Sequence, residues 1–127
     1  MKKVLILGSS GSIGVNTLNV IRNFPDKFEV AALTVNSRID ILEEQVNEFK
    51  PVLVAIKDEK AAKIFRQKIG NKCTVLSGTD GLIKAAAEAD YDILIGAMVG
   101  FAGLAPTIEA VKRGKRIALA NKETLVV

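Results

Sequence analysis

Three glycines at regular spacing follow the first apolar run of this 127-residue chain. After Val4 to Leu7 the sequence reads Gly8-Ser9-Ser10-Gly11-Ser12-Ile13-Gly14 and passes into a helical pattern. Glycine lets a backbone turn tightly and approach a ligand closely, and the free N–H groups of a helix N-terminus attract an anion. The segment therefore predicts a pyrophosphate-binding loop. The alternative is a tight turn without a ligand, because the G-x-x-G-x-x-G spacing differs from the G-x-G-x-x-G fingerprint.

A second polar segment follows the next apolar run, Phe28 to Val35, and reads Asn36-Ser37-Arg38. In dinucleotide-binding folds the end of the second strand meets the adenosine ribose, where an acidic residue selects NAD. Here there is none, and a guanidinium suits a 2′-phosphate. The segment therefore predicts NADP(H). The alternative is that Asn36 and Ser37 form a turn that caps the next helix, with Arg38 in solvent.

Two later segments follow apolar runs of the same kind. The stretch from Gly96 to Gly103 is rich in small residues, which permit close approach of a nicotinamide ribose or make a flexible connection. The segment Asn121-Lys122-Glu123-Thr124 follows Arg116 to Leu119. On the residue types alone, the expected structural role is that Asn121 caps a helix with Glu123 in its first turn, and the alternative is contact with a ligand at the carboxyl edge.

The elements that must position these segments alternate along the chain. Short runs rich in β-branched residues predict buried strands, and helical apolar stripes lie between them. The stripes are expected to face the sheet and include Ile13, Leu18 and Ile21, then Leu42 and Val46, then Ile64 and Phe65, and last Leu104, Ile108 and Val111. Such alternation predicts an α/β fold, a doubly wound Rossmann-like parallel sheet with helices on both faces, in one domain over residues 1–127. The expected strands are Val4–Leu7, Phe28–Val35, Val52–Ile56, Thr74–Leu76, Ile93–Ile95 and Arg116–Leu119.

Composition excludes several classes of function. The net charge is +4, but lysines are interspersed with carboxylates and tryptophan is absent, so we expect no nucleic-acid partner. No apolar run reaches the roughly 18 residues that span a bilayer, so we expect a cytoplasmic protein without a membrane anchor or signal peptide. Cys73 is the only cysteine and histidine is absent, which excludes an internal disulfide and a zinc set of thiols and imidazoles. Cys73 is expected to be a small, partly buried apolar side chain.

Three runs of the sequence resemble the N-terminal domain of the 1-deoxy-D-xylulose 5-phosphate reductoisomerase family. The most specific is Ala118-Leu119-Ala120-Asn121-Lys122-Glu123-Thr124-Leu125-Val126. The others are Ile6 to Gly14, which other reductases share, and Gly100 to Thr107. The resemblance covers all 127 residues, and the apolar end at Leu125-Val126-Val127 suggests a fragment of a longer protein.

The resemblance implies an enzyme that isomerises 1-deoxy-D-xylulose 5-phosphate and reduces the product with NADPH to 2-C-methyl-D-erythritol 4-phosphate, in isoprenoid synthesis. It implies a divalent metal, Mg or Mn, and a homodimer whose contacts lie outside this segment. The metal-binding and C-terminal domains are expected to be absent from this chain, so the chain alone should be inactive. By resemblance, the cofactor-binding residues are Gly8, Ser10, Gly11, Ser12, Ile13, Asn36, Ser37, Arg38, Asn121 and Glu123, and Lys122 reaches the substrate; no catalytic or metal-binding residue lies in this chain.

The sequence departs from the family pattern in two places, and two other functions are also compatible with it. Ser10 replaces the threonine frequent in the family, and the glycine-lysine pair common at the ribose-phosphate position is absent, so Arg38 is expected to supply the cation from a neighbouring position. One rival is another NADPH-dependent reductase with the same loop, such as a dihydrodipicolinate reductase or an aspartate semialdehyde dehydrogenase relative. The other is a non-catalytic module that senses a nucleotide.

Overall fold

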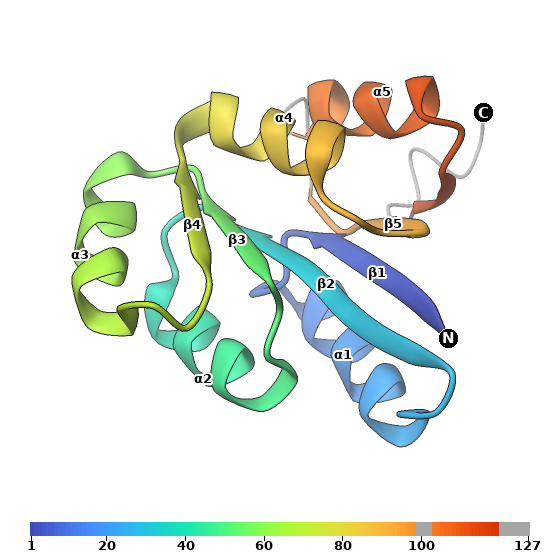
Figure 1. The fold of residues 1–127 in the computed structure, drawn as a ribbon, viewed down its shortest axis with the longest axis horizontal. Coiled ribbons are helices and arrows are strands. Elements are labelled where there is room, and N and C mark those ends of the chain that lie inside the picture. Colours follow the sequence, from blue (N-terminus) through green and yellow to red (C-terminus); the bar gives the residue numbers. More distant parts are fainter. Residues whose placement is uncertain (99–102, 120–127) are drawn as a thin grey trace.

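The computed structural model describes residues 1–98 and 103–119, in which strands and helices alternate from the first residues onward (Figure 1). The strands are β1 (Lys2–Leu7), β2 (Phe28–Val35), β3 (Leu53–Ile56), β4 (Thr74–Ser77), β5 (Ile93–Gly96) and β6 (Arg116–Leu119). The helices are α1 (Ser12–Asn23), α2 (Ile39–Phe49), α3 (Glu59–Ile69), α4 (Gly78–Glu88) and α5 (Leu104–Lys112). Every strand and helix predicted from the sequence is present, with ends that differ by a few residues.

All six strands pair in parallel in one sheet of order β4-β3-β2-β1-β5-β6. The chain runs outward from β1 through β2 and β3 to β4, and then crosses back to place β5 on the other side of β1. The strand order reverses there, and open parallel sheets bind their ligands at the carboxyl ends of strands at such a point. The doubly wound fold class is confirmed.

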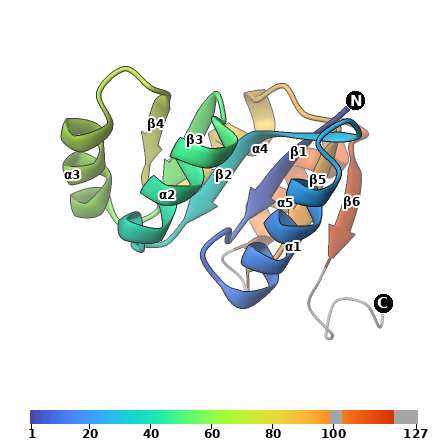
Figure 2. The ribbon, with the colours of Figure 1, turned by 90° about the horizontal axis from the view of Figure 1, so that it is seen from below.

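Helices cover both faces of the sheet, and Figure 2 shows α1, α2 and α3 on the face opposite α4 and α5. Successive residues of β1 serve different faces, because side chains alternate along a strand. Val4 and Ile6 pack in the core beneath α1, α2 and α3, whereas Leu5 and Leu7 pack beneath α4 and α5. All four are almost fully buried, which explains why the strand reads as a continuous apolar run.

The prediction that the apolar stripe of α5 faces the sheet is wrong, because Leu104, Ile108 and Val111 are exposed. The helix instead buries Pro106 and Ala110. Ala110 shares a core cluster with alanines of α4, and small side chains allow two helices to approach closely, so the bulky residues are left on the outer side.

The predictions that Ile13 and Ile64 face the sheet are also wrong, because both residues are exposed. In α3 the predicted residue Phe65 is buried, as is Ala61, so the prediction for this helix fails only at Ile64. Cys73 is half-buried beside the core, as predicted, and burial raises the pKa of its thiol. None of the helices in residues 1–98 and 103–119 is long and apolar enough to cross a membrane.

Candidate functional site

The segments that follow β1, β2 and β5 meet at the carboxyl edge of the sheet. The backbone N–H groups of Gly8 and Ser9 donate to the carbonyl oxygen of Thr34, at N···O distances of 3.0 and 2.9 Å. On the other side, the N–H of Ala97 donates to the carbonyl of Leu7 at 2.9 Å. The predicted phosphate loop therefore lies between the ends of β2 and β5, at the point where the strand order reverses.

Two of the three loop glycines are required by the protein's own packing. Gly8 has a φ of +82°, a left-handed conformation that side chains disfavour. Gly14, in the first turn of α1, is buried against the loop: a Cβ there would lie 2.3 Å from the carbonyl oxygen of Gly8 and 2.7 Å from the Cα of Ser9. Only glycine at this position allows α1 to begin so close to the loop.

Gly11 differs from the other two, because nothing in the described structure requires a glycine there. Its φ is −77°, which any residue adopts, and the nearest heavy atom to an added Cβ would be 3.9 Å away. The residue is exposed. The loop surface at Gly11 is thus open to the approach of another molecule, as a pyrophosphate-binding loop requires.

The N-terminus of α1 offers unpaired backbone donors directly beside Gly11. Gly11 is the N-cap residue and supplies no side chain, and the first turn contains no acidic residue. The first helical hydrogen bond runs from the N–H of Val15 to the carbonyl of Gly11 at 2.9 Å. Among residues 1–98 and 103–119, no acceptor pairs with the N–H groups of the exposed Ser12 and Ile13. These donors and the helix dipole fit an anionic ligand.

A buried polar cluster behind the loop was not anticipated from the sequence. Within the described part of the chain, the buried polar side chains are Ser9, Thr34 and Gln45. The Ser9 hydroxyl donates to Gln45 Oε1 at 2.8 Å, and Gln45 Nε2 donates to the Ser9 carbonyl at 2.8 Å. The Thr34 hydroxyl accepts from the N–H of Gly8 at 3.1 Å. The one signal in the sequence was a glutamine next to Val46, on the inward side of the α2 stripe.

The predicted ribose-phosphate segment, Asn36 to Arg38, is exposed at the start of α2. The helix begins at Ile39 with Arg38 as its N-cap residue and without a side-chain capping bond, although the N–H of Ile39 donates to the backbone carbonyl of Ser37 at 2.8 Å. Arg38 Nε and Nη2 donate to the two carboxylate oxygens of Asp40, each at 3.3 Å. This pairing raises the pKa of the Arg38 guanidinium and lowers the pKa of the Asp40 carboxyl. Asp40 is a second member of this surface that the sequence analysis did not single out.

The remaining predicted site residues, Asn121, Lys122 and Glu123, lie outside the described residues, as do residues 99–102 of the small-residue segment after β5. Met98, the residue before the undescribed positions 99–102, lies against the loop: its Cγ would be 2.9 Å from a Cβ added at Gly8. In residues 1–98 and 103–119, no group of three or more acidic, cysteine or histidine side chains could hold a metal ion.

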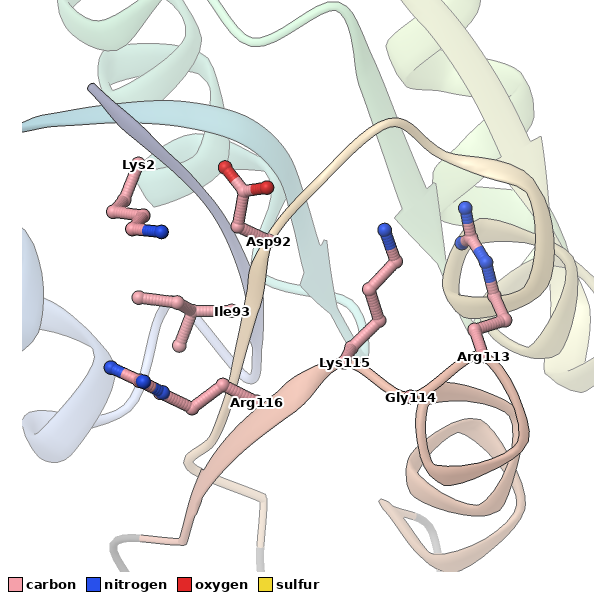
Figure 3. Close-up of a pocket in the computed structure, with 7 residues that line it drawn as sticks. All are labelled: Lys2, Asp92, Ile93, Arg113, Gly114, Lys115 and Arg116. Carbon is pink, nitrogen blue, oxygen red and sulfur yellow. The ribbon is translucent and has the colours of Figure 1, made fainter.

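A separate basic pocket of about 480 Å³ opens at the opposite, amino edge of the sheet (Figure 3). Two of its cations have structural partners, because Arg113 and Lys115 lie over the ring of Tyr91 at 5.0 and 5.3 Å from the centroid. Arg113 Nη1 also donates to the carbonyl of Ala86 at 2.8 Å. Its position at the amino edge, remote from the switch point, separates this pocket from the candidate cofactor site.

Comparison with known proteins agrees with this geometry. The family model described as 1-deoxy-D-xylulose 5-phosphate reductoisomerase matches residues 4–127. The reductoisomerase of Thermodesulfovibrio yellowstonii is 54% identical over 127 residues, a match that covers 100% of this chain and 33% of the relative. That of Geotalea uraniireducens is 52% identical, and the match covers 99% of this chain and 33% of the relative.

Solved structures of the same family superpose closely. The reductoisomerase from Zymomonas mobilis in complex with NADPH matches with a TM-score of 0.89 and 33% identity, over 98% of this chain and 33% of that one. A DOX-P reductoisomerase in complex with NADPH, fosmidomycin and magnesium matches with a TM-score of 0.91 and 40% identity, over 99% of this chain and 31% of that one. The chain spans about a third of the length of its relatives. With nearly all of its residues matched by the family model, the chain belongs to the 1-deoxy-D-xylulose 5-phosphate reductoisomerase family.

Proposed function

We propose that this chain is the NADPH-binding part of a 1-deoxy-D-xylulose 5-phosphate reductoisomerase. The observation that carries the proposal is the open surface at Gly11 beside the N–H groups of Ser12 and Ile13, which have no acceptor among residues 1–98 and 103–119, at the switch point of the sheet. Two related structures contain NADPH. Family membership also favours this function over the other reductases and the nucleotide sensor.

In this proposal the loop and the start of α2 bind different parts of the cofactor. Ser10, Gly11, Ser12 and Ile13 contact the pyrophosphate, and Gly8 provides the turn that brings them to it. Asn36, Ser37 and Arg38 surround the adenosine ribose and its 2′-phosphate. By resemblance to the family, Asn121 and Glu123 touch NADPH, and Lys122 reaches the substrate.

The reaction of the whole protein is proposed from the family. NADPH supplies a hydride when bound, and the substrate is 1-deoxy-D-xylulose 5-phosphate. The divalent metal, Mg or Mn, is expected to bind in the part of the protein that relatives have and this chain does not span; magnesium is present in related structures. By the same resemblance, the full protein acts as a homodimer with its dimer contacts outside this segment. We also propose a cytoplasmic location.

Calorimetric titration of the purified chain with NADPH and, separately, with NADH tests the cofactor proposal. We expect the chain to bind NADPH with a lower dissociation constant than NADH, because the exposed Arg38 lies at the start of α2, where the 2′-phosphate is proposed to bind. Equal affinities would contradict the assignment of the 2′-phosphate site. Absence of binding to either dinucleotide would contradict the proposed function of the loop.

We expect the chain alone to turn over no substrate even when it binds NADPH. The family resemblance places the metal-binding carboxylates outside this segment, and a ketol rearrangement needs a metal or equivalent group to polarise the oxygens. The measurement is the loss of absorbance of reduced nicotinamide, at about 340 nm, when the purified chain is mixed with NADPH, 1-deoxy-D-xylulose 5-phosphate and Mg²⁺. Oxidation above the rate without protein would contradict this expectation.

A further inference from the structure

We infer that Gln45 is a positioning residue for the cofactor: it orients the Ser9–Ser10 peptide so that the phosphate loop presents its donors to the pyrophosphate. This inference rests on the proposed NADPH-binding function and adds to it a residue of α2 that contacts the loop and is not itself proposed to contact the ligand. Both polar atoms of the Gln45 side chain are used on Ser9, through bonds of 2.8 Å each.

The orientation follows from the planarity of the peptide bond. In a trans peptide the carbonyl of one residue and the N–H of the next point in opposite directions, and no cis peptide is present among the described residues. Gln45 Nε2 holds the carbonyl of Ser9 toward the buried side of the loop. The N–H of Ser10 therefore points away from the buried side of the loop on which Gln45 lies.

The neighbouring peptides are held in the same way by Thr34. Its carbonyl accepts from the N–H groups of both Gly8 and Ser9, and its hydroxyl accepts from Gly8 as well. The first two amides of the loop are thus directed inward, whereas Gln45 turns the chain so that the next amide faces outward. The change from inward-pointing to outward-pointing N–H groups occurs at Ser9, to which Gln45 forms two hydrogen bonds.

Burial explains why these two hydrogen bonds require a glutamine at position 45. Ser9 is 0% exposed and Gln45 is 7% exposed, so water cannot replace the two hydrogen bonds. A buried amide costs desolvation free energy, and its neighbours Leu42 and Val46 on the same helix are apolar core residues. A leucine or methionine would fill this place without that cost, but it could not hold the Ser9 carbonyl. Buried polar networks of this kind specify one local conformation, and here that conformation is the one a pyrophosphate needs.

The experiment compares NADPH and NADH titrations of the wild-type chain, Gln45→Met and Ser9→Ala. Methionine is close to glutamine in size but forms neither bond, so we expect Gln45→Met to weaken binding of both dinucleotides by the same factor, about tenfold. The factor is common because both dinucleotides contain the pyrophosphate. Ser9→Ala loses only the Oγ–Oε1 bond and keeps the bond to the carbonyl, so it should weaken both by a smaller common factor, and it remains informative if Gln45→Met does not fold.

Tyr91→Phe is the matched control for loss of a buried hydrogen bond. The Tyr91 hydroxyl donates to the Ala86 carbonyl at 2.6 Å, at the amino edge of the sheet. This variant should lower the melting temperature while leaving both dissociation constants unchanged. If Gln45→Met folds and binds both dinucleotides as tightly as the wild type, the inference is overturned. If only Ser9→Ala folds, unchanged affinities in that variant overturn it. In both cases binding by the wild-type chain leaves the proposed function intact. A wild-type chain that binds neither dinucleotide would instead overturn the proposed function.

Discussion

Replacement of Gly14 by alanine is expected to lower the free energy of unfolding by about 2 to 4 kcal/mol, even after the roughly 1 kcal/mol that alanine gains over glycine in a helix. The added Cβ would lie 2.3 Å from the Gly8 carbonyl oxygen and 2.8 Å from the Ser9 carbonyl carbon. Both atoms belong to the backbone, so no side chain can rotate away. The loop or the first turn of α1 must move instead. Urea denaturation of Gly14→Ala and wild type measures the difference.

Gly11→Ala is the matched control, three residues away in the same loop. Among the described residues its new Cβ would have no neighbour nearer than 3.9 Å, and its φ of −77° is open to alanine. We expect a loss of unfolding free energy no greater than about 1 kcal/mol, the difference between glycine and alanine at an N-cap. NADPH affinity should nevertheless fall, because the methyl group occupies the surface to which the pyrophosphate must come. If Gly11→Ala destabilised the protein as much as Gly14→Ala, the distinction between a packing glycine and a ligand glycine would be wrong.

Arg38→Ala is expected to weaken NADPH binding by about tenfold to a hundredfold and to leave NADH binding nearly unchanged. A charge-assisted contact between an arginine and a phosphate contributes roughly 1.5 to 3 kcal/mol, and only NADPH has the 2′-phosphate. In the structure Arg38 is held by Asp40, so the phosphate must share or replace a carboxylate partner. That exchange reduces the net gain and places the expected effect toward the lower end of the range. Calorimetric titration of the variant with each dinucleotide measures the two changes.

Lys63→Ala controls for the general loss of a positive charge. Lys63 is exposed on α3, outside the proposed ribose-phosphate segment, and its removal changes the net charge by the same amount. It should weaken NADPH binding much less than Arg38→Ala at the same ionic strength. Equal losses of NADPH and NADH affinity in Arg38→Ala would show that the side chain does not read the 2′-phosphate.

The local sequence determined the elements and the position of the glycine-rich loop after β1, because both depend on patterns within about a dozen residues. Continuous apolar runs such as Val4 to Leu7 predict strands buried on two faces, and alternation with helical stripes predicts a parallel sheet. A glycine-rich segment that lies directly between a strand and a helix was therefore expected at the carboxyl edge. The structure confirms each of these predictions.

Helix faces were predicted less well, because burial depends on what each helix packs against. The apolar stripe of α5 looked like a core face, yet Leu104 and Ile108 are exposed and Ala110 is buried. The deciding factor is the close approach of α4, which favours small residues at the contact. Periodicity identifies an amphipathic helix, but it does not say which neighbour a helix meets.

By itself, the sequence determined the fold class, the loop and the polar segment after β2 that suggests NADP(H). Only the tertiary structure decided what each loop residue does. Gly14 and the carbonyl of Gly8 meet because a turn brings them together, and Ser9 meets Gln45 across 36 positions of chain because α2 packs behind the loop. The positions of buried donors and acceptors depend on contacts between segments that are distant in sequence. Local residue patterns carry little information about such contacts.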